Sequence, residues 1–332
     1  MGAQAYEAQV ISRAADAMGP SWQMRELVFR SMRSTLPGNR RLPLGRVARS
    51  SSAVRRQVGR MLFANDTVSH RMGLELPPAA DGDVITLHDV VAWRFPDESP
   101  PVSAAKEEAR SADAVICVSA FTAEEAVRFL GVRNPHVVPN GVDPRYLHAL
   151  PMEAVERARH GLSGQYVLHA GGAAERKNLA ALAQAWPRVH AERPELTLAL
   201  AGPPHPRRTA LFAGMPGVVL LGRLPDEAMP GLVAAASAAV VPSLYEGFGL
   251  PALEAMAAGV PVVAARTSSL PEVVGDAGVL VQPDSAGIAA GLIDVVSDPA
   301  AAADLVSRGR ARSAQFTWER SAAGHAAVWK SL

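Results

Sequence analysis

Residues 240–263 read VVPSLYEGFGLPALEAMAAGVPVV, and this stretch decides the fold. The apolar run that opens it, which starts at residue 238, predicts a buried parallel strand. A turn with two glycines follows, and Pro251 stands where a helix favours its first residue. Gly259 ends that helix, and the apolar residues after it predict the next strand. The stretch therefore predicts a strand, a glycine-rich turn and a helix N-terminus, followed by a second strand.

Two carboxylates flank this turn, Glu246 just before it and Glu254 on the helix. The N-terminus of a helix has unpaired N–H groups and a partial positive charge, which suit a phosphate. Carboxylates that pointed at phosphates would repel them, so we expect both glutamates to accept hydrogen bonds from hydroxyls. A nucleotide sugar offers both kinds of group. The alternative is an acidic helix start with glycines for the turn, which leaves the backbone entropy cost of two close glycines unexplained.

Composition bounds the class of protein. The chain has 332 residues and an apolar fraction of 48%, enough for two globular domains. Cys117 is the single cysteine, so no internal disulfide can form. No apolar run reaches the roughly 18 residues of a spanning helix, and no signal peptide opens the chain. We therefore expect a cytoplasmic protein whose membrane contact, if it has one, is peripheral.

Arginine is unevenly placed along the chain. Residues 25–60 contain ten arginines and one acid, Glu26. This asymmetry predicts a basic face on the first domain. Two interpretations stay open: a solvated surface, or attraction to an anionic acceptor or to the anionic inner face of a membrane. Nucleic acid is a weaker interpretation because the stretch lacks interleaved aromatic residues.

The rest of the chain alternates strands and helices, which predicts doubly wound parallel sheets in two domains, 1–150 and 151–315. The chain opens directly on a helical pattern, so we expect the first sheet to lack its first strand. Residues 316–332 form an amphipathic helix that packs on its own domain or crosses back to the first.

Further polar residues stand at predicted strand ends, where open α/β sheets bind ligands. The strand at 83–87 delivers His88 and Asp89. The strand at 166–170 leads into a glycine turn and then into Arg176 and Lys177, a pair suited to gripping a phosphate. Later strand ends present backbone groups suited to a nucleobase edge.

In combination these motifs resemble the retaining glycosyltransferases of the GT-B fold, family 4, and most of all the bacterial mannosyltransferase-like members of polysaccharide or antibiotic pathways. The similarity covers nearly the whole chain from Gly2. The motifs that carry it are the E-x7-E pair Glu246 and Glu254, the RKN at 176–178, the HD at 88–89, the NGVD at 140–143 and the G-x-PV at 259–262.

The resemblance implies two Rossmann-like domains that face each other across a cleft, with a nucleoside-diphosphate sugar held mostly by the second. It implies that Arg176 and Lys177 bind the diphosphate and that Glu254 binds the ribose. His88 would contact the donor sugar from the acceptor side, and Glu246 would hold that sugar. The expected catalytic residues are therefore His88, Glu246, Arg176 and Lys177, and all of them except His88 are also expected donor contacts, as is Glu254. The remaining expected donor contacts are Gly2, Arg223, Leu224, Gly247, Phe248, Gly249 and Leu250.

The expected reaction is transfer of a hexose with retention, from a GDP-mannose-like or UDP-sugar donor to a polysaccharide, lipid-linked or secondary-metabolite acceptor. No Asp-x-Asp motif lies at a strand end, so we expect neither a metal nor a cofactor besides the donor. Two alternatives stay open: a non-catalytic sugar-nucleotide-binding protein derived from such an enzyme, and a nucleotide-sugar epimerase.

Overall fold

The structure is a computed structural model that describes residues 2–332, and the chain divides into two compact units. Unit 1 joins the chain up to Gly141 with Trp318–Leu332, and unit 2 is Val142–Thr317. The division therefore falls about nine residues before the sequence-based boundary at residue 150. The physical reason is that the Val142 N–H already bonds to the Phe316 carbonyl of unit 2, at 2.9 Å. Each unit is described below by itself.

Unit 2 is built on a six-stranded sheet in which every pairing is parallel. The strand order is β12-β11-β10-β7-β8-β9. The chain thus adds β8 and β9 on one side of β7, then crosses to the other side of β7 and adds β10, β11 and β12 there. The strands are β7 (Tyr166–Ala170), β8 (Thr197–Ala201), β9 (Val218–Gly222), β10 (Ala238–Val241), β11 (Val262–Ala265) and β12 (Val279–Val281). The point between β7 and β10 is the topological switch point, where ligands of such sheets bind.

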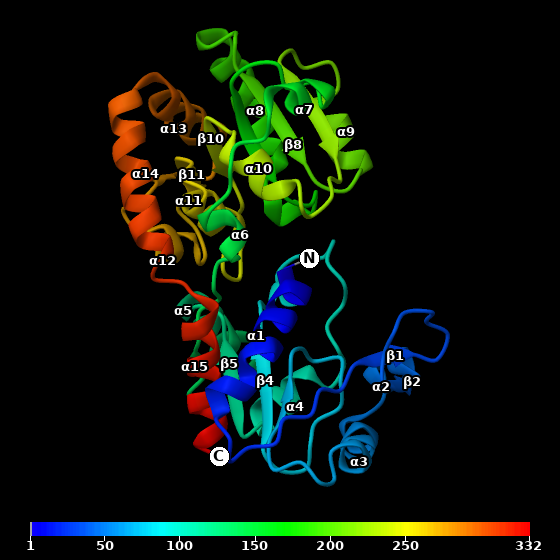
Figure 1. Cartoon of the computed structure of the whole chain (residues 1–332). Helices are drawn as coiled ribbons and strands as arrows, with labels where there is room; N and C mark the ends of the chain where they lie inside the picture. The colour runs from blue at the N-terminus through cyan, green and yellow to red at the C-terminus, as the bar shows by residue number, and fades with distance from the viewer. Residues whose placement is uncertain (1) are drawn as a thin grey trace. The chain divides into compact units, whose positions relative to one another are not determined.

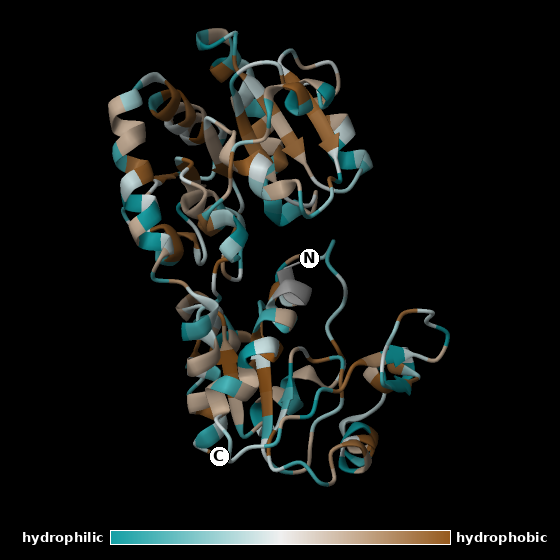
Figure 2. Cartoon of the chain, viewed as in Figure 1, coloured by the Kyte–Doolittle hydropathy of each residue, from teal (hydrophilic) through white to brown (hydrophobic). Residues whose placement is uncertain are grey.

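Helices pack against this sheet and bury its apolar strands. Helix α8 packs on α13, and α11 packs on α14. The fully buried Trp186 of α8 lies in the largest core cluster, and Figure 2 shows the strands in the brown of hydrophobic residues. The helices are α6 (Pro144–Leu147), α7 (Ala154–Arg159), η3 (Glu175–Lys177), α8 (Leu179–Glu192), α9 (Pro206–Phe212), α10 (Met229–Ala234), α11 (Leu250–Ala257), α12 (Leu270–Val274), α13 (Ser285–Ser297) and α14 (Pro299–Ser313).

Unit 1 is a smaller parallel sheet of four contiguous strands, in the order β3-β4-β5-β6. Among the described residues β3 and β6 are its edges. The strands are β3 (Ser69–Arg71), β4 (Asp83–Leu87), β5 (Ala114–Cys117) and β6 (His136–Val137), and β1 (Phe29–Ser31) pairs separately with β2 (Arg40–Leu42). The helices are α1 (Gly2–Met18), α2 (Leu44–Ala48), α3 (Ser52–Leu62), η1 (Val91–Trp93), α4 (Ala105–Ser111), α5 (Ala120–Glu125), η2 (Ala126–Leu130) and α15 (Trp318–Lys330).

The first and last helices of the chain lie side by side in unit 1 (Figure 1). Arg13 of α1 pairs with Glu319 of α15 at 2.9 Å, and Lys330 Nζ donates to the Ala17 carbonyl at 3.0 Å. The C-terminal helix thus belongs to unit 1. Within residues 2–332 no single helix has the length and apolar character to cross a membrane, although one sharply bent pair, Ser285–Ser297 with Pro299–Lys330, meets the length and composition test.

Candidate functional site

The switch point of unit 2 carries a buried charged cluster around Glu246. Glu246 follows β10 and is 7% exposed. Lys177, from the loop after β7, places Nζ 2.6 Å from Glu246 Oε1, and Ser243 Oγ donates to the same oxygen at 2.8 Å. Arg176 Nη1 lies 3.6 Å from Oε2. The structure thus brings together the predicted diphosphate cations and the predicted sugar-binding acid.

The electrostatics of this cluster favour a charged carboxylate. Burial by itself would raise the pKa of Glu246, but the charge and hydrogen bond of Lys177 outweigh it, with help from Arg176 and the Ser243 hydroxyl. The net result is a pKa below the usual value for glutamate. An ammonium has three N–H donors, and Glu246 takes one of those on Lys177. The cluster can therefore offer positive charge to an anion and carboxylate oxygens to hydroxyls.

Backbone hydrogen bonds fix the two loops of the site to each other. The Leu244 N–H donates to the Arg176 carbonyl at 2.7 Å. Asn178 adopts a left-handed conformation with φ 54°, and its amide donates to the carbonyls of Pro242 and Pro283 at 3.0 and 2.8 Å. The cations and the acid are therefore held at the ends of β7 and β10 by the backbone as well as by charge.

The glycine-rich turn is closely packed. Gly249 has φ 103°, a conformation that residues with a Cβ rarely adopt, and a Cβ there would lie 2.9 Å from Leu270 Cδ2, so the Leu270 side chain would have to shift. Two serines brace the turn: Ser268 Oγ accepts from the Glu246 N–H at 3.0 Å, and Ser269 Oγ donates to the Glu246 carbonyl at 2.8 Å. Sequence reasoning missed these serines because they follow β11, more than twenty residues downstream.

A buried arginine holds the glycine turn after β7. Arg208 of α9 is 3% exposed, and its guanidinium donates to the carbonyls of Gly171 and Pro203, the latter at 2.9 Å. Gly202 has φ 146°, and a Cβ there would lie 2.0 Å from the Gly171 carbonyl oxygen. The turns after β7 and β8 are therefore in direct contact, which a side chain at Gly202 would prevent.

The other predicted donor contacts of unit 2 lie in the glycine-rich turn, on α11 and after β9. Gly247 and Phe248 are buried in the turn, and Leu250 begins α11. Glu254 lies one turn further along α11, the helix that packs on α6. Arg223 and Leu224 follow β9, with Arg223 exposed and Leu224 5% exposed. Their roles toward a donor stay predictions.

His88 lies in unit 1, directly after β4, and Gly2 begins α1. The Tyr6 ring stands edge-on to the His88 ring, with centroids 4.5 Å apart. Burial lowers the pKa of His88 to about 4, against a backbone hydrogen bond to Met72 that raises it. His88 is therefore neutral at pH 7, and its Nε2 has no partner among the described residues. That nitrogen can accept a hydrogen bond from a hydroxyl. The predicted contacts of His88 and Gly2 with a donor stay predictions.

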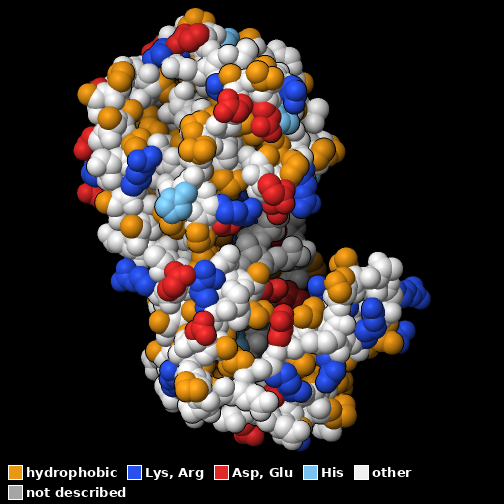
Figure 3. All heavy atoms as spheres, in the orientation of Figure 1, with side chains coloured by type: hydrophobic (Ala, Val, Ile, Leu, Met, Phe, Trp, Pro, Cys, Tyr) orange, Lys and Arg blue, Asp and Glu red, His pale blue; other side chains and the backbone are white. Residues whose placement is uncertain are grey.

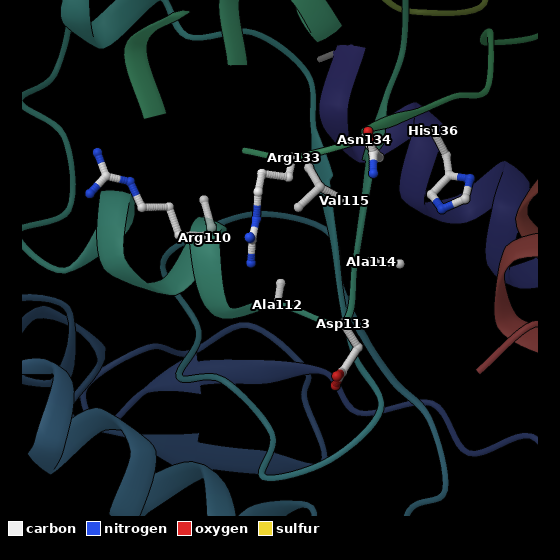
Figure 4. Close-up of a pocket in the computed structure, with 9 residues that line it drawn as sticks. Arg110, Ala112, Asp113, Ala114, Val115, Arg133, Asn134 and His136 are labelled. Atoms are coloured by element: carbon white, nitrogen blue, oxygen red, sulfur yellow. The ribbon is translucent and has the colours of Figure 1, made fainter. Parts of the chain in front are cut away.

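A hollow of about 390 Å³ lies in unit 1, and its lining includes none of the predicted site residues (Figure 4). It is lined by the amino ends of β5 and β6 and the end of α4, including Arg110, Asp113 and His136. Ligands of parallel sheets bind at the carboxyl ends of strands, so this hollow lies at the wrong edge of the sheet. The described residues contain no cluster of His, Cys, Asp and Glu arranged to hold a metal ion.

Comparisons with known proteins agree with this geometry. The pattern described as "Glycosyltransferase Family 4" matches residues 5–146, and "Glycosyl transferases group 1" matches 164–298. O-antigen chain mannosyltransferase B of Escherichia coli is 32% identical over 292 residues, which cover 80% of this chain and 74% of that protein.

Two further similarities come from a mycobacterial relative and a solved structure. The GDP-mannose-dependent alpha-(1-6)-phosphatidylinositol dimannoside mannosyltransferase of Mycobacterium tuberculosis is 35% identical over 64% of this chain, which spans 56% of that relative's length. Sucrose-phosphate synthase from Thermosynechococcus elongatus has a TM-score of 0.67 and 26% identity, and the match covers 82% of this chain and 75% of that one.

The E-x7-E pair, the cation pair and the switch-point sheet therefore stand in a chain whose sequence and fold match one group of enzymes throughout. The fold is α/β with two Rossmann-like units, as the sequence predicted. The chain belongs to glycosyltransferase family 4, among its mannosyltransferase-like members, and is a GT-B glycosyltransferase that uses a nucleotide-sugar donor.

Proposed function

We propose that the chain is a retaining hexosyltransferase that moves mannose from GDP-mannose to a polysaccharide, lipid-linked or secondary-metabolite acceptor. The observation that carries the proposal is the contact of Lys177 with Glu246 at the switch point of unit 2. The names of the two mannosyltransferase relatives favour mannose as the sugar, and the name of the mycobacterial relative favours GDP as the nucleotide. UDP-sugars are the second donor class to test.

In this proposal the cations and the acid of the cluster bind different parts of the donor. Arg176, Lys177 and the N-terminus of α11 bind the diphosphate, and Glu246 accepts hydrogen bonds from hydroxyls of the hexose. Glu254 does the same for the ribose. Phosphate binding draws on N–H groups of Lys177 beyond the one that Glu246 takes, so the ammonium can bridge acid and phosphate.

The reaction then needs positioning and charge stabilisation. The bond from the anomeric carbon to the phosphate oxygen breaks, and the acceptor oxygen bonds to the same face of that carbon. The acceptor proton passes to the departing phosphate oxygen. Arg176 and Lys177 stabilise the negative charge that develops on the diphosphate, which is the part that a metal ion plays in other transferases. The proposal therefore requires no metal and no further cofactor.

The arginine-rich region of unit 1 supports an additional proposal, contact with an anionic membrane surface at the cytoplasmic face. Met32 and Leu36 are 63% and 59% exposed beside β1 and β2. Figure 3 shows Lys and Arg side chains in blue beside hydrophobic side chains in orange on the part of unit 1 that carries β1 and β2. The exposed arginines are Arg33, Arg40, Arg41, Arg46 and Arg49. Cosedimentation with phosphatidylglycerol vesicles tests this contact. We expect binding at low salt and its loss at about 0.5 M salt, where the Debye length of a few ångströms screens the exposed arginines.

Three measurements together test the main proposal. Isothermal titration with GDP, UDP and dTDP identifies the base, and incubation with the matching sugar nucleotide and a panel of mannosides identifies the acceptor. Proton NMR of the product reports whether the anomeric configuration is kept. We expect GDP to bind most tightly and the product to be an α-mannoside. Binding without turnover on any acceptor supports a non-catalytic protein, and donor conversion that needs no acceptor supports an epimerase.

A further inference from the structure

Ser243 lies between β10 and the glycine-rich turn, and it is fully buried. Its hydroxyl donates to Glu246 Oε1 at 2.8 Å. Its carbonyl accepts from the Thr267 hydroxyl at 2.9 Å, so the loop after β11 holds its backbone in place. Ser243 is therefore a fixed donor to the acid that the proposed function assigns to the hexose.

The two oxygens of the Glu246 carboxylate have different surroundings. Oε1 accepts from Lys177 Nζ at 2.6 Å and from the Ser243 hydroxyl at 2.8 Å. A carboxylate oxygen has two lone pairs, so these two donors use the capacity of Oε1. Oε2 lies 3.6 Å from Arg176 Nη1, which is an ion-pair distance and too long for a hydrogen bond. Oε2 is therefore the oxygen with capacity to accept from a hydroxyl of the donor.

The backbone of Glu246 is fixed from the loop after β11. Ser268 Oγ accepts from the Glu246 N–H at 3.0 Å, and Ser269 Oγ donates to the Glu246 carbonyl at 2.8 Å. Ser268 makes its contact in a left-handed conformation with φ 52°, which a residue with a Cβ rarely adopts and which persists only where its surroundings enforce it. With both backbone groups held, the orientation of the Glu246 carboxylate is set by the two donors to Oε1.

We propose that Ser243 is a positioning residue for the hexose: together with Lys177 it holds Oε1, so that Oε2 of Glu246 accepts from a hydroxyl of the transferred sugar. The inference rests on the proposed function, because it takes a hexose hydroxyl as the ligand of Glu246. An ammonium can share its three N–H groups between acid and phosphate, whereas a hydroxyl has one O–H, which Ser243 gives to Oε1. Ser243 therefore acts on the binding of the sugar and not on the binding of the nucleotide.

Calorimetry with two ligands on the full chain separates these effects. GDP and GDP-mannose are titrated into the wild-type protein and into Ser243→Ala. We expect the affinity for GDP-mannose to fall about tenfold, the worth of a hydrogen bond to a charged group, and the affinity for GDP to stay within about twofold. Ser243→Cys, whose S–H is a weak donor, should give an intermediate affinity for GDP-mannose. The control is Ser313→Ala, which removes an equally buried hydroxyl, bonded to the Arg310 carbonyl at 3.0 Å, and should leave both affinities unchanged.

A set of modified donors identifies the sugar hydroxyl that Glu246 contacts. Analogues of GDP-mannose that each lack one hydroxyl of the hexose are titrated into the wild-type protein and Ser243→Ala. For the hydroxyl that donates to Oε2, loss of the hydroxyl and loss of Ser243 should be non-additive, because either change removes the same interaction. For the other hydroxyls the two losses should add. A merely structural role for Ser243 would lower the affinity for every donor by the same factor.

The outcomes distinguish this inference from the proposed function. Equal affinity of wild type and Ser243→Ala for GDP-mannose, an equal loss for GDP and GDP-mannose, or additive losses for every analogue overturns the inference and leaves the proposed function standing. If GDP-mannose does not bind the wild-type chain, the proposed function is wrong and the inference fails with it. Calorimetry reports stoichiometry separately from affinity, so a poorly folded variant is recognised by its lower stoichiometry.

Discussion

Arg55 and Arg56 are neighbours on α3 that lie in opposite environments. Arg55 is fully buried, and its guanidinium bonds to the Glu108 carboxylate and to the carbonyls of Leu74 and Leu76 at 2.8 and 2.7 Å. Arg56 forms an exposed pair with Glu107 at 2.6 Å. Arg55 therefore does not belong to the basic face that the arginine count at 25–60 predicted. It holds the loop before β4 in place.

These neighbours make a matched test of buried and exposed charge. We expect Arg55→Met to lower the free energy of unfolding of unit 1 by about 3–5 kcal/mol, because the buried Glu108 Oε1 and the Leu74 carbonyl lose their donor. Arg56→Met should cost less than about 1 kcal/mol. Urea unfolding followed by tryptophan fluorescence reports mainly on unit 1, since four of the five tryptophans belong to it and Trp186 alone lies in unit 2. Equal midpoints for the two variants would contradict the assignment.

In the proposed function, Lys177 is the residue on which donor binding most depends. Its removal leaves burial of Glu246 unopposed by the largest favourable charge, so the pKa of that carboxyl rises. We expect Lys177→Ala to weaken GDP binding by about tenfold or more, since a charged hydrogen bond to the diphosphate is lost. The pH optimum of transfer should also move upward. Lys106→Ala, at an exposed lysine of unit 1, is the control. Full activity of Lys177→Ala on its donor would overturn the site.

At the residue scale the sequence predicts contacts between residues that stand in recognisable strand-and-turn motifs. It does not predict contacts that depend on a partner in a distant element. Lys177 and Glu246 each follow an apolar strand and a turn, so parallel pairing alone brings them to one edge of the sheet. Ser268 and Ser269 carry no such signal, because they brace the Glu246 turn from a loop more than twenty residues further along the chain. Arg55 was read as one of ten surface arginines because burial of a charge is decided by a partner in another helix.

Four elements of unit 1 meet in one directed chain of hydrogen bonds. His325 Nδ1 faces the Ser321 carbonyl at 2.7 Å and so carries the proton, which leaves Nε2 as the acceptor for the Tyr6 hydroxyl at 2.5 Å. Tyr6 in turn accepts from Thr86, 2.9 Å away, and Thr86 accepts from His70 Nε2 at 2.8 Å. Helices α1 and α15 are thus joined to β3 and β4 through side chains that span the chain from residue 6 to residue 325.

The hydroxyl of Tyr6 is the centre of that chain, and its removal tests how firmly the helices are attached. Tyr6→Phe keeps the ring beside His88 but leaves the Thr86 hydroxyl without its acceptor and His325 Nε2 without its donor. We expect a loss of about 1–3 kcal/mol in the stability of unit 1, the cost of unsatisfied buried polar groups. Hydrogen exchange followed by mass spectrometry should show faster exchange in α1 and α15. Tyr166→Phe is the control, since it should affect unit 2 alone. Unchanged exchange in α15 would show that apolar packing suffices.

The sequence placed both of these helices but could not place their contact. The sequence indicates both the helix near the N-terminus and the amphipathic tail at 316–332, but it allows two destinations for the tail. What decides between them is the pairing of Tyr6 with His325, and no local pattern encodes a partner more than three hundred residues away. Strand order in unit 1 was equally undetermined, because β3 is only three residues long.

Across the whole molecule, histidines with a depressed pKa are unevenly divided between the two units. His70, His88 and His325 lie in unit 1, and His169 lies in unit 2. Burial is the largest cause that lowers the pKa of each, to about 4 for His88, His169 and His325. In the unfolded chain these groups return to the ordinary value near 6.5. Between these two values the unfolded state binds more protons than the folded state.

Mild acid should therefore weaken unit 1 before unit 2. Because the folded pKa values are depressed, the stability contributed by these histidines is complete above about pH 6.5 and is lost progressively as the pH falls toward 4. Hydrogen exchange at pH 7.5 and pH 5.5, corrected for the intrinsic rate, should show a larger loss of protection in β4, α1 and α15 than in β7 and α8. His325→Gln removes one titrating group and should flatten the response of unit 1, whereas replacing the exposed His136 should not. Equal loss in both units would mean that the carboxylates, rather than the histidines, set the acid response.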